Sequence, residues 1–157
     1  MNKTELQALR RLLFFSAPEA AQWVAASEER HAGVSERAWR LWEAGDRPIP
    51  ADVAECMRSL ADWRSLMLAN VGAEIAEAQI KTGRLPEVVL VWYKSLTDWL
   101  KNGESELLWR PQQSVLAHLV ATHANVRLVE FDAASYSEWL TGRKDSPAMR
   151  SAWAGLQ

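Results

Sequence analysis

One stretch of the chain, residues 33–50, constrains the fold more than any other, because it carries both a start and a stop signal for a short helix. Ser35 belongs to the residue types that cap helix N-termini, and Gly33 interrupts the chain just before it. Gly45 can close a helix in the left-handed conformation, and Pro48 and Pro50 oppose any continuation. The sequence therefore predicts a helix that begins after Ser35 and ends at Gly45.

This expected helix has two different faces. Apolar residues recur at helical spacing on the face expected to pack inward, namely Val34, Ala38, Trp39 and Trp42. The other face carries Glu36, Arg37, Arg40 and Leu41. A buried tryptophan face opposite an arginine-bearing start is typical of a DNA recognition helix. Stacking of single-stranded bases on the two tryptophans is the alternative, but their position opposite the charges favours a core role.

Two helices are expected before this one. Residues 3–14 place Leu6, Leu9 and Leu13 on one apolar stripe. Ser16 and Glu19 then form a capping box that opens a second helix, which is expected to end near residue 25. Residues 25–32 add about eight residues where a helix-turn-helix has three or four. This insertion is either a solvated loop or a source of phosphate contacts from Arg30 or His31.

The remaining chain predicts one long helix followed by a mixed segment. Apolar residues recur at helical spacing over residues 50–81, and Gly83 and Pro86 end the pattern. Two stretches rich in β-formers, residues 87–93 and 126–131, are expected to be strands. Helices are expected at residues 95–100, 111–123 and 133–140, with a last one in the tail. This order predicts a small α+β domain.

The N-terminal third resembles the Cro/CI-type, or Xre-like, helix-turn-helix regulators. More narrowly, the chain resembles the YdiL-like regulators and the anti-CRISPR-associated type 2 repressors. The motifs that carry this likeness are Glu5-Leu6-Gln7-Ala8-Leu9-Arg10, Ser35…Trp39-x-x-Trp42-Glu43-x-Gly45, Ile49-Pro50 and Trp109-Arg110-x-x-Gln113-Ser114-Val115. The resemblance implies a mainly α fold: a lambda-repressor-like helix-turn-helix domain, a long connecting helix and a small α+β domain. We expect the first domain with its helix at residues 1–82. The second domain is expected at residues 83–157 and, by this analogy, to mediate dimerisation.

The same resemblance implies the function and its residues. We expect a homodimeric repressor, often of its own gene, that binds an inverted repeat in double-stranded DNA and has RNA as a second possible ligand. The positions matching the family's base-reading residues are Ser35, Glu36, Arg37, Arg40 and Leu41. Phosphate contacts are expected from Ser16, Ala17, Arg47, Lys3 and Arg11. Arg10 and Glu43 match a buried ion pair with a structural role.

Composition limits the other classes of function. The net charge is −2, and residues 1–50 carry seven basic and seven acidic side chains, so DNA binding must rely on local contacts. Cys56 is the single cysteine, and His118 and His123 lack the spacing of helical zinc ligands. We therefore expect no metal, no cofactor and no catalytic activity. No apolar run reaches membrane-spanning length, so we expect a cytoplasmic protein without membrane contact.

Two alternatives remain open. The helix-turn-helix could serve protein recognition, as in an antitoxin or adaptor, which the neutral charge and the insertion favour. The C-terminal domain could instead hold a small-molecule effector between Trp92, Trp99 and Trp109, which would make the protein a ligand-gated regulator.

Overall fold

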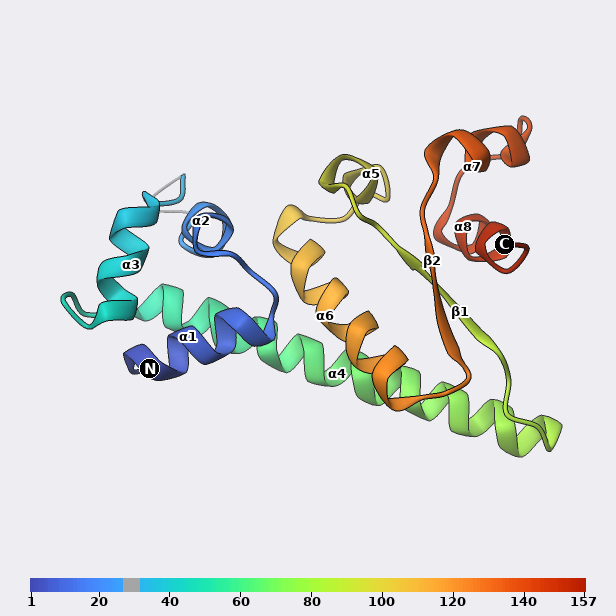
Figure 1. Ribbon diagram of the computed structural model, residues 1–157, viewed down its shortest axis with the longest axis horizontal. Helices are drawn as coiled ribbons and strands as arrows, with labels where there is room; N and C mark the ends of the chain where they lie inside the picture. The colour runs from blue at the N-terminus through green and yellow to red at the C-terminus, as the bar shows by residue number, and fades with distance from the viewer. Residues whose placement is uncertain (27–31) are drawn as a thin grey trace. The chain divides into compact units, whose positions relative to one another are not determined.

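The computed structural model describes residues 1–26 and 32–157, and the chain divides into two compact units. Unit 1 consists of Met1–Met67 together with Arg110–Ser114, and unit 2 consists of Leu68–Trp109 together with Val115–Gln157. The fold is mainly helical, as expected, with two short strands among the described residues (Figure 1). Most of the predicted insertion, including Arg30 and His31, lies outside the described residues.

Three helical segments of unit 1 begin at side-chain caps, and the sequence indicated two of these caps, Ser16 and Ser35. Asn2 caps α1 (Lys3–Leu12) in a capping box with Glu5. Ser16 and Glu19 form the second capping box, at the start of α2 (Ala17–Glu19). Ser35 caps α3 (Glu36–Ala44), and Gly45 ends it with a φ of 85°. These caps satisfy backbone groups that a helix terminus otherwise leaves unpaired.

The second helix departs from regular α geometry. After its single α turn it continues as a π-helical segment, η1 (Ala20–Val24), in which the Ala25 N–H donates to the Ala20 carbonyl at 3.2 Å. This segment also contacts the residues just before α3: the Val34 N–H donates to the Ala21 carbonyl at 2.8 Å. The last residue before the α3 cap is thus tied directly to the second helix.

The core of unit 1 forms around Trp39. Its side chain is fully buried, and its ring meets that of Trp42 edge to face, with centroids 5.7 Å apart. Both rings therefore belong to the core, and stacking of bases on them is excluded by burial. Other large, fully buried apolar side chains come from α1 and its C-cap, from η1 and from the start of α4 (Ala51–Thr82): Leu6, Leu13, Val24, Val53 and Met57.

Unit 2 is built on a two-stranded parallel sheet (Figure 1). Strand β1 (Val88–Trp92) pairs with β2 (Val126–Glu130) in a register that runs from Val88↔Val126 to Trp92↔Glu130. Parallel strands need a long crossover, and here α5 (Leu96–Leu100) and α6 (Glu106–Thr122) supply it. Helices α7 (Ala133–Leu140) and α8 (Pro147–Ala154) follow the second strand.

The expected start of α6 is wrong by five residues. The helix begins at Glu106 behind the cap Ser105, and Pro111 lies inside it. Proline favours the first turn of a helix, because further along it lacks the N–H that would donate to the carbonyl four residues earlier. Pro111 is fully buried, and its carbonyl accepts a hydrogen bond from the Ser114 hydroxyl at 2.9 Å.

Unit 2 contains a buried arginine, Arg150. Arg150 is 3% exposed and donates two hydrogen bonds to Asp145, at 3.0 and 2.5 Å. Its guanidinium lies over three aromatic rings, those of Tyr93, Phe131 and Tyr136. The hydrogen bonds from Arg150, opposed by burial and aided by Tyr136, lower the pKa of Asp145 to about 2. The carboxylate therefore stays charged and keeps the buried cation paired.

In the part of the chain that the structure describes, no helix is both long and apolar enough to cross a membrane.

Gly33 gives a direct test of the contact between the second helix and the start of α3. A Cβ atom at this position would lie 2.3 Å from the carbonyl oxygens of both Ala21 and Gln22. These are backbone atoms, which cannot swing aside as a side chain can. We expect Gly33→Ala to lower the free energy of unfolding by roughly 1–3 kcal/mol in chemical denaturation.

Gly72 is the matched control. It lies inside α4, and nothing lies within 4 Å of a Cβ built there. Gly72→Ala is expected to raise stability by about 0.5–1 kcal/mol, because alanine is the better helix former. Equal effects of the two substitutions would contradict the close approach at Gly33.

Candidate nucleic-acid interface

The outer face of α3 carries the five residues expected to read bases. Arg37 and Arg40 are exposed, as is Ser35, while Glu36 and Leu41 are half-buried. The Ser35 hydroxyl accepts a hydrogen bond from the Ala38 N–H at 3.2 Å, so it serves as the helix cap. Arg40 is paired with Glu36 one turn away, through an Nε bond of 2.8 Å.

The two arginines differ in whether they already form an ion pair. Within residues 1–26 and 32–157, no carboxylate forms an ion pair with Arg37. Its guanidinium can therefore reach a base edge without first breaking an ion pair with any of these residues. Arg40 must release Glu36, or share it, before it can bind a base or a phosphate. Of the two arginines, Arg37 is thus the better candidate for a contact with a base.

The five residues expected to contact phosphates fall into two groups. Arg11 and Arg47 are exposed. The other three serve the fold: the Ser16 N–H and hydroxyl donate to Glu19 at 2.8 and 2.7 Å, Ala17 is buried, and the Lys3 amino group donates to the Ala44 carbonyl at 3.1 Å. A lysine at the end of α3 is also favoured by the helix dipole.

The Glu43 carboxylate connects α3 to α1. Arg10 donates to both of its oxygens, Nε to Oε1 at 2.6 Å and Nη2 to Oε2 at 3.2 Å. The Trp39 indole N–H donates to the same Oε1 at 2.9 Å. The side chains of Arg10 and Glu43 are only 14% and 10% exposed. The pair expected from the sequence is therefore a nearly buried, two-pronged ion pair with a third donor.

Backbone contacts reinforce this junction. The Gln7 amide donates to the Glu43 carbonyl at 3.2 Å, and Arg10 also donates to the Phe15 carbonyl at 2.9 Å. Burial alone would raise the pKa of Glu43. The hydrogen bonds from Arg10 and Trp39, with the charges of Arg10 and Arg11, outweigh burial and leave the pKa lowered. Glu43 therefore remains ionised, and α3 is held in one orientation against α1.

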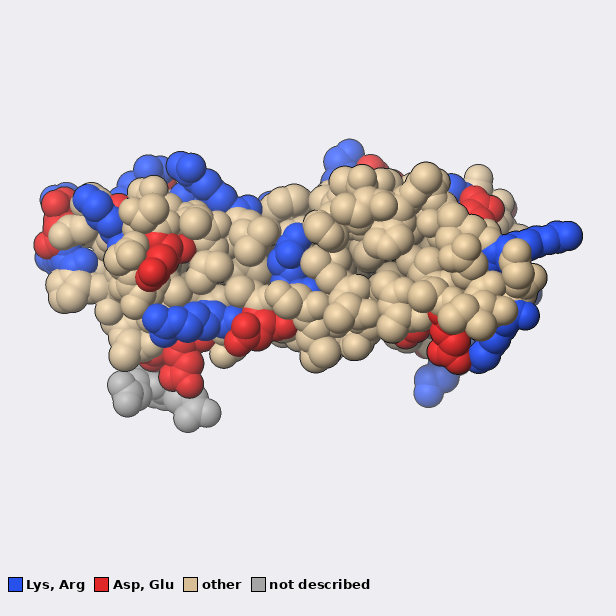
Figure 2. Space-filling view, turned by 90° about the horizontal axis from the view of Figure 1, so that it is seen from below, with Lys and Arg blue, Asp and Glu red and all other residues tan. Residues whose placement is uncertain are grey.

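Exposed side chains of both signs occur on unit 1, as Asp46 and Arg47 illustrate. Figure 2 shows basic and acidic side chains close to one another on the face drawn, with no broad field of one charge. Several cations of unit 1 are neutralised within the molecule, as the pairs of Arg10 with Glu43 and of Arg40 with Glu36 illustrate. Any nucleic-acid contact on this unit must therefore depend on individual exposed arginines.

The sequence did not indicate one ion pair, between Glu19 and Arg110. The Arg110 Nε donates to Glu19 Oε1 at 2.7 Å across 91 positions of the chain. The capping box identifies Glu19, but no local pattern connects it to α6. The only available signal was the motif at residues 109–115, in which the structure pairs Arg110 with Gln113 at 2.8 Å.

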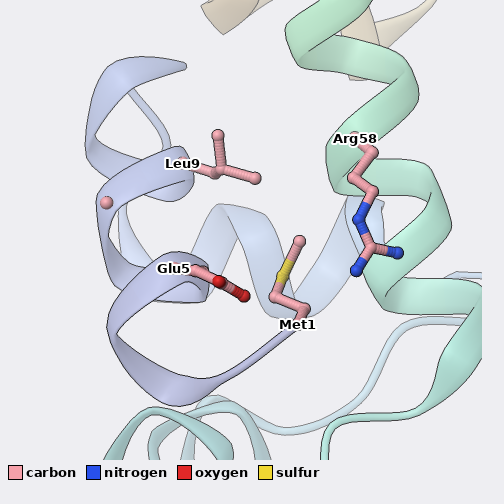
Figure 3. Close-up of a pocket in the computed structure, with 5 residues that line it drawn as sticks. Met1, Glu5, Leu9 and Arg58 are labelled. Carbon is pink, nitrogen blue, oxygen red and sulfur yellow. The ribbon is translucent and has the colours of Figure 1, made fainter.

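A cavity of about 300 Å³ opens beside α1, lined by Met1, Glu5, Ala8, Leu9 and Arg58 (Figure 3). Glu5 already accepts a hydrogen bond from the Asn2 N–H at 2.7 Å. The cavity therefore offers a ligand mainly apolar surface and the Arg58 guanidinium. In the described residues there is no group of three His, Cys, Asp or Glu side chains that could hold a metal ion.

The tryptophans considered as an effector site are largely part of the core of unit 2. Trp99 and Trp109 are buried, and their indole N–H groups donate at 2.9 Å to the carbonyls of Ser105 and Tyr93. The indole N–H donors that could orient a bound ligand are therefore already used within the protein. Their arrangement is that of packed core residues.

Comparisons with known proteins agree with the resemblance noted from the motifs. The family model described as Aca2/YdiL-like matches residues 1–128. The Aca2 repressor of Pectobacterium phage ZF40 is 34% identical over 120 residues, covering 74% of this chain and 90% of that protein. The uncharacterized protein YdiL of Escherichia coli (strain K12) is 30% identical over 123 residues, covering 77% of this chain and 94% of that protein.

Glu43 provides the test of the junction between α1 and α3. Glu43→Ala leaves the nearly buried guanidinium of Arg10 without its carboxylate and removes the acceptor of the Trp39 indole. We expect a loss of about 3–5 kcal/mol in the free energy of unfolding, measured by urea denaturation at neutral pH.

Glu36→Ala is the matched control, because it removes a carboxylate from the same helix but breaks only an exposed pair. Its cost should stay below about 1 kcal/mol. The pH dependence gives a second readout. Because folding lowers the pKa of Glu43, its stabilisation is present above the ordinary glutamate pKa and is lost as the pH falls through the lowered value. A Glu43→Ala protein with parental stability and the parental acid profile would refute the structural role.

Proposed function

The chain belongs to the Aca2/YdiL-like family, and on that premise we propose that it is a transcriptional regulator which binds double-stranded DNA through unit 1. A relative named as a repressor supports the regulatory role. The observation that carries DNA binding is the two-sided construction of α3. Its inner face is held against α1 through Glu43, while Arg37 is exposed on the outer face and forms no ion pair with a carboxylate of the described residues.

The geometry around α3 is suited to a helix-turn-helix reader. The second helix and α3 are joined by the hydrogen bond from Val34 to Ala21. In such readers the recognition helix, which α3 would be here, places its first turn in the major groove. Ser35, Glu36, Arg37, Arg40 and Leu41 would then face base edges. Arg37 would pair with the O6 and N7 atoms of a guanine, as the planar guanidinium fork allows.

We assign the phosphate contacts mainly to Arg11 and Arg47, the two exposed arginines of the expected set. Lys3, Ser16 and Ala17 would contribute chiefly by holding the helices in place, since Lys3 and Ser16 already donate within the molecule. A few local contacts of this kind reconcile DNA binding with a net charge of −2.

We further propose that the regulator acts as a homodimer on an inverted repeat and represses by occupying a promoter. Two copies of the reader would engage half-sites whose centres lie one helical turn apart, ~34–36 Å, or a multiple of that. Residues 83–157 would supply the dimer contacts. Function without catalysis, metal or cofactor is part of the same proposal.

Selection from a randomised duplex library with the purified protein tests the reader. We expect enrichment of an inverted repeat, with Arg37→Ala losing preference at one base position of each half-site. The lost discrimination should correspond to about 1–3 kcal/mol, the usual value of a bidentate arginine–guanine contact.

Arg47→Ala is the control with the same loss of charge. It should weaken binding to all sequences alike and flatten the salt dependence, without changing the selected sequence. Absence of any enrichment at low salt, with the protein folded, would contradict DNA reading. The helix-turn-helix would then be a protein-recognition module.

A further inference from the structure

The Glu19 carboxylate joins two segments that are far apart in the sequence. Its Oε2 atom closes the capping box of the second helix by accepting from the Ser16 N–H and hydroxyl. Its Oε1 atom accepts from Arg110, at 2.7 Å from Nε and 2.6 Å from Nη2. Burial opposes the ionisation of Glu19, but these hydrogen bonds prevail and the pKa is lowered.

The segment that supplies Arg110 is itself fixed within unit 1. Residues Arg110–Ser114 pack with this unit, although the flanking turns of α6 belong to unit 2. Gln113 and Ser114 are buried polar residues; Gln113 accepts from Arg110 at 2.8 Å, and Ser114 accepts from the Arg64 Nε at 3.0 Å. Buried polar groups must keep their partners, so this segment has little freedom to move away from Glu19.

The second helix in turn contacts the two residues that precede the cap of α3. The Ala21 carbonyl in η1 accepts from the Val34 N–H, and Gly33 lies against the carbonyls of Ala21 and Gln22. The next residue is Ser35, the cap of α3. Each step in this series is a hydrogen bond or a close backbone contact within unit 1.

We propose that Arg110 is a positioning residue for DNA reading: through Glu19 it fixes the second helix, and the second helix fixes the first turn of α3. The inference rests on the proposed DNA binding of unit 1. It assigns a role in base recognition to a residue of α6 that itself touches no base. It also gives unit 2 a covalent route to the reader, because the flanking turns of α6 continue into that unit.

A positioning role differs from a direct phosphate contact in what it changes. Misplacing the first turn of α3 impairs base contacts, which determine specificity. Losing a phosphate contact weakens binding to every sequence and lowers the salt slope by about one. The two roles therefore separate in measurements on a specific and a non-specific duplex.

The test measures the affinities of Arg110→Gln, Glu19→Gln and the double variant for two fluorescein-labelled duplexes of equal length. One carries the sequence enriched by the parent protein, and the other has mixed sequence. We expect each single variant to bind the enriched duplex on the order of tenfold more weakly. Binding to the mixed duplex should stay within about twofold of the parent, with an unchanged salt slope.

The double variant tests whether the two residues act together. Both single changes break the same link, so the double variant should bind the enriched duplex about as weakly as either single variant. Arg58→Gln is the control, because it removes a cation from α4 in unit 1 without touching Glu19. It should leave the preference for the enriched duplex unchanged.

Two results would overturn the proposal. In one, Arg110→Gln binds both duplexes more weakly and with a smaller salt slope, which would mark Arg110 as a phosphate contact. In the other, a folded Arg110→Gln keeps the parental preference. If that variant does not fold, Arg110→Lys replaces it, with a loss of about threefold confined to the enriched duplex and the same two contradicting results. Failure of the parent to enrich any sequence would instead refute the proposed function.

Discussion

The arrangement of unit 1 depends on one nearly buried carboxylate. Glu43 accepts two hydrogen bonds from Arg10 on α1 and one from the Trp39 indole on its own helix. Removing two charges from water is costly, and only a full set of partners compensates for it. Because Arg10 and Trp39 supply these partners, the ion pair admits one orientation of α3 on α1. That orientation determines which residues of α3 face the solvent.

In the proposed function, the DNA reader would make few contacts from fixed positions. The core holds Trp39 and Trp42, so the outer face of α3 is left to Glu36, Arg37 and Arg40. On this face Arg40 and Glu36 form an ion pair, and Figure 2 shows charges of both signs close together on the side of the molecule that it draws. A neutral unit cannot attract DNA strongly at long range. On this account, recognition depends on the placement of the exposed arginines more than on their number.

Local signals predicted more of the fold than of the site. The caps Ser35 and Gly45 gave α3 correctly, because capping involves only neighbouring residues. The start of α6 was missed because Ser105 caps the helix earlier, and the packing of the buried Pro111 outweighs its usual preference for a first turn. The link between Glu19 and Arg110 spans 91 positions, so no spacing rule could indicate it. The close approach at Gly33 likewise arises only when the second helix packs against the segment before α3.

The central claim is that the outer face of α3 meets DNA while its inner face holds the fold. Titration of ¹⁵N-labelled protein with the enriched duplex, followed by amide chemical shifts, tests this most directly. The account predicts that the largest changes fall on residues 35–41, with further changes at Arg11 and Arg47. Changes confined to unit 2, or none in a folded protein at low salt, would contradict it.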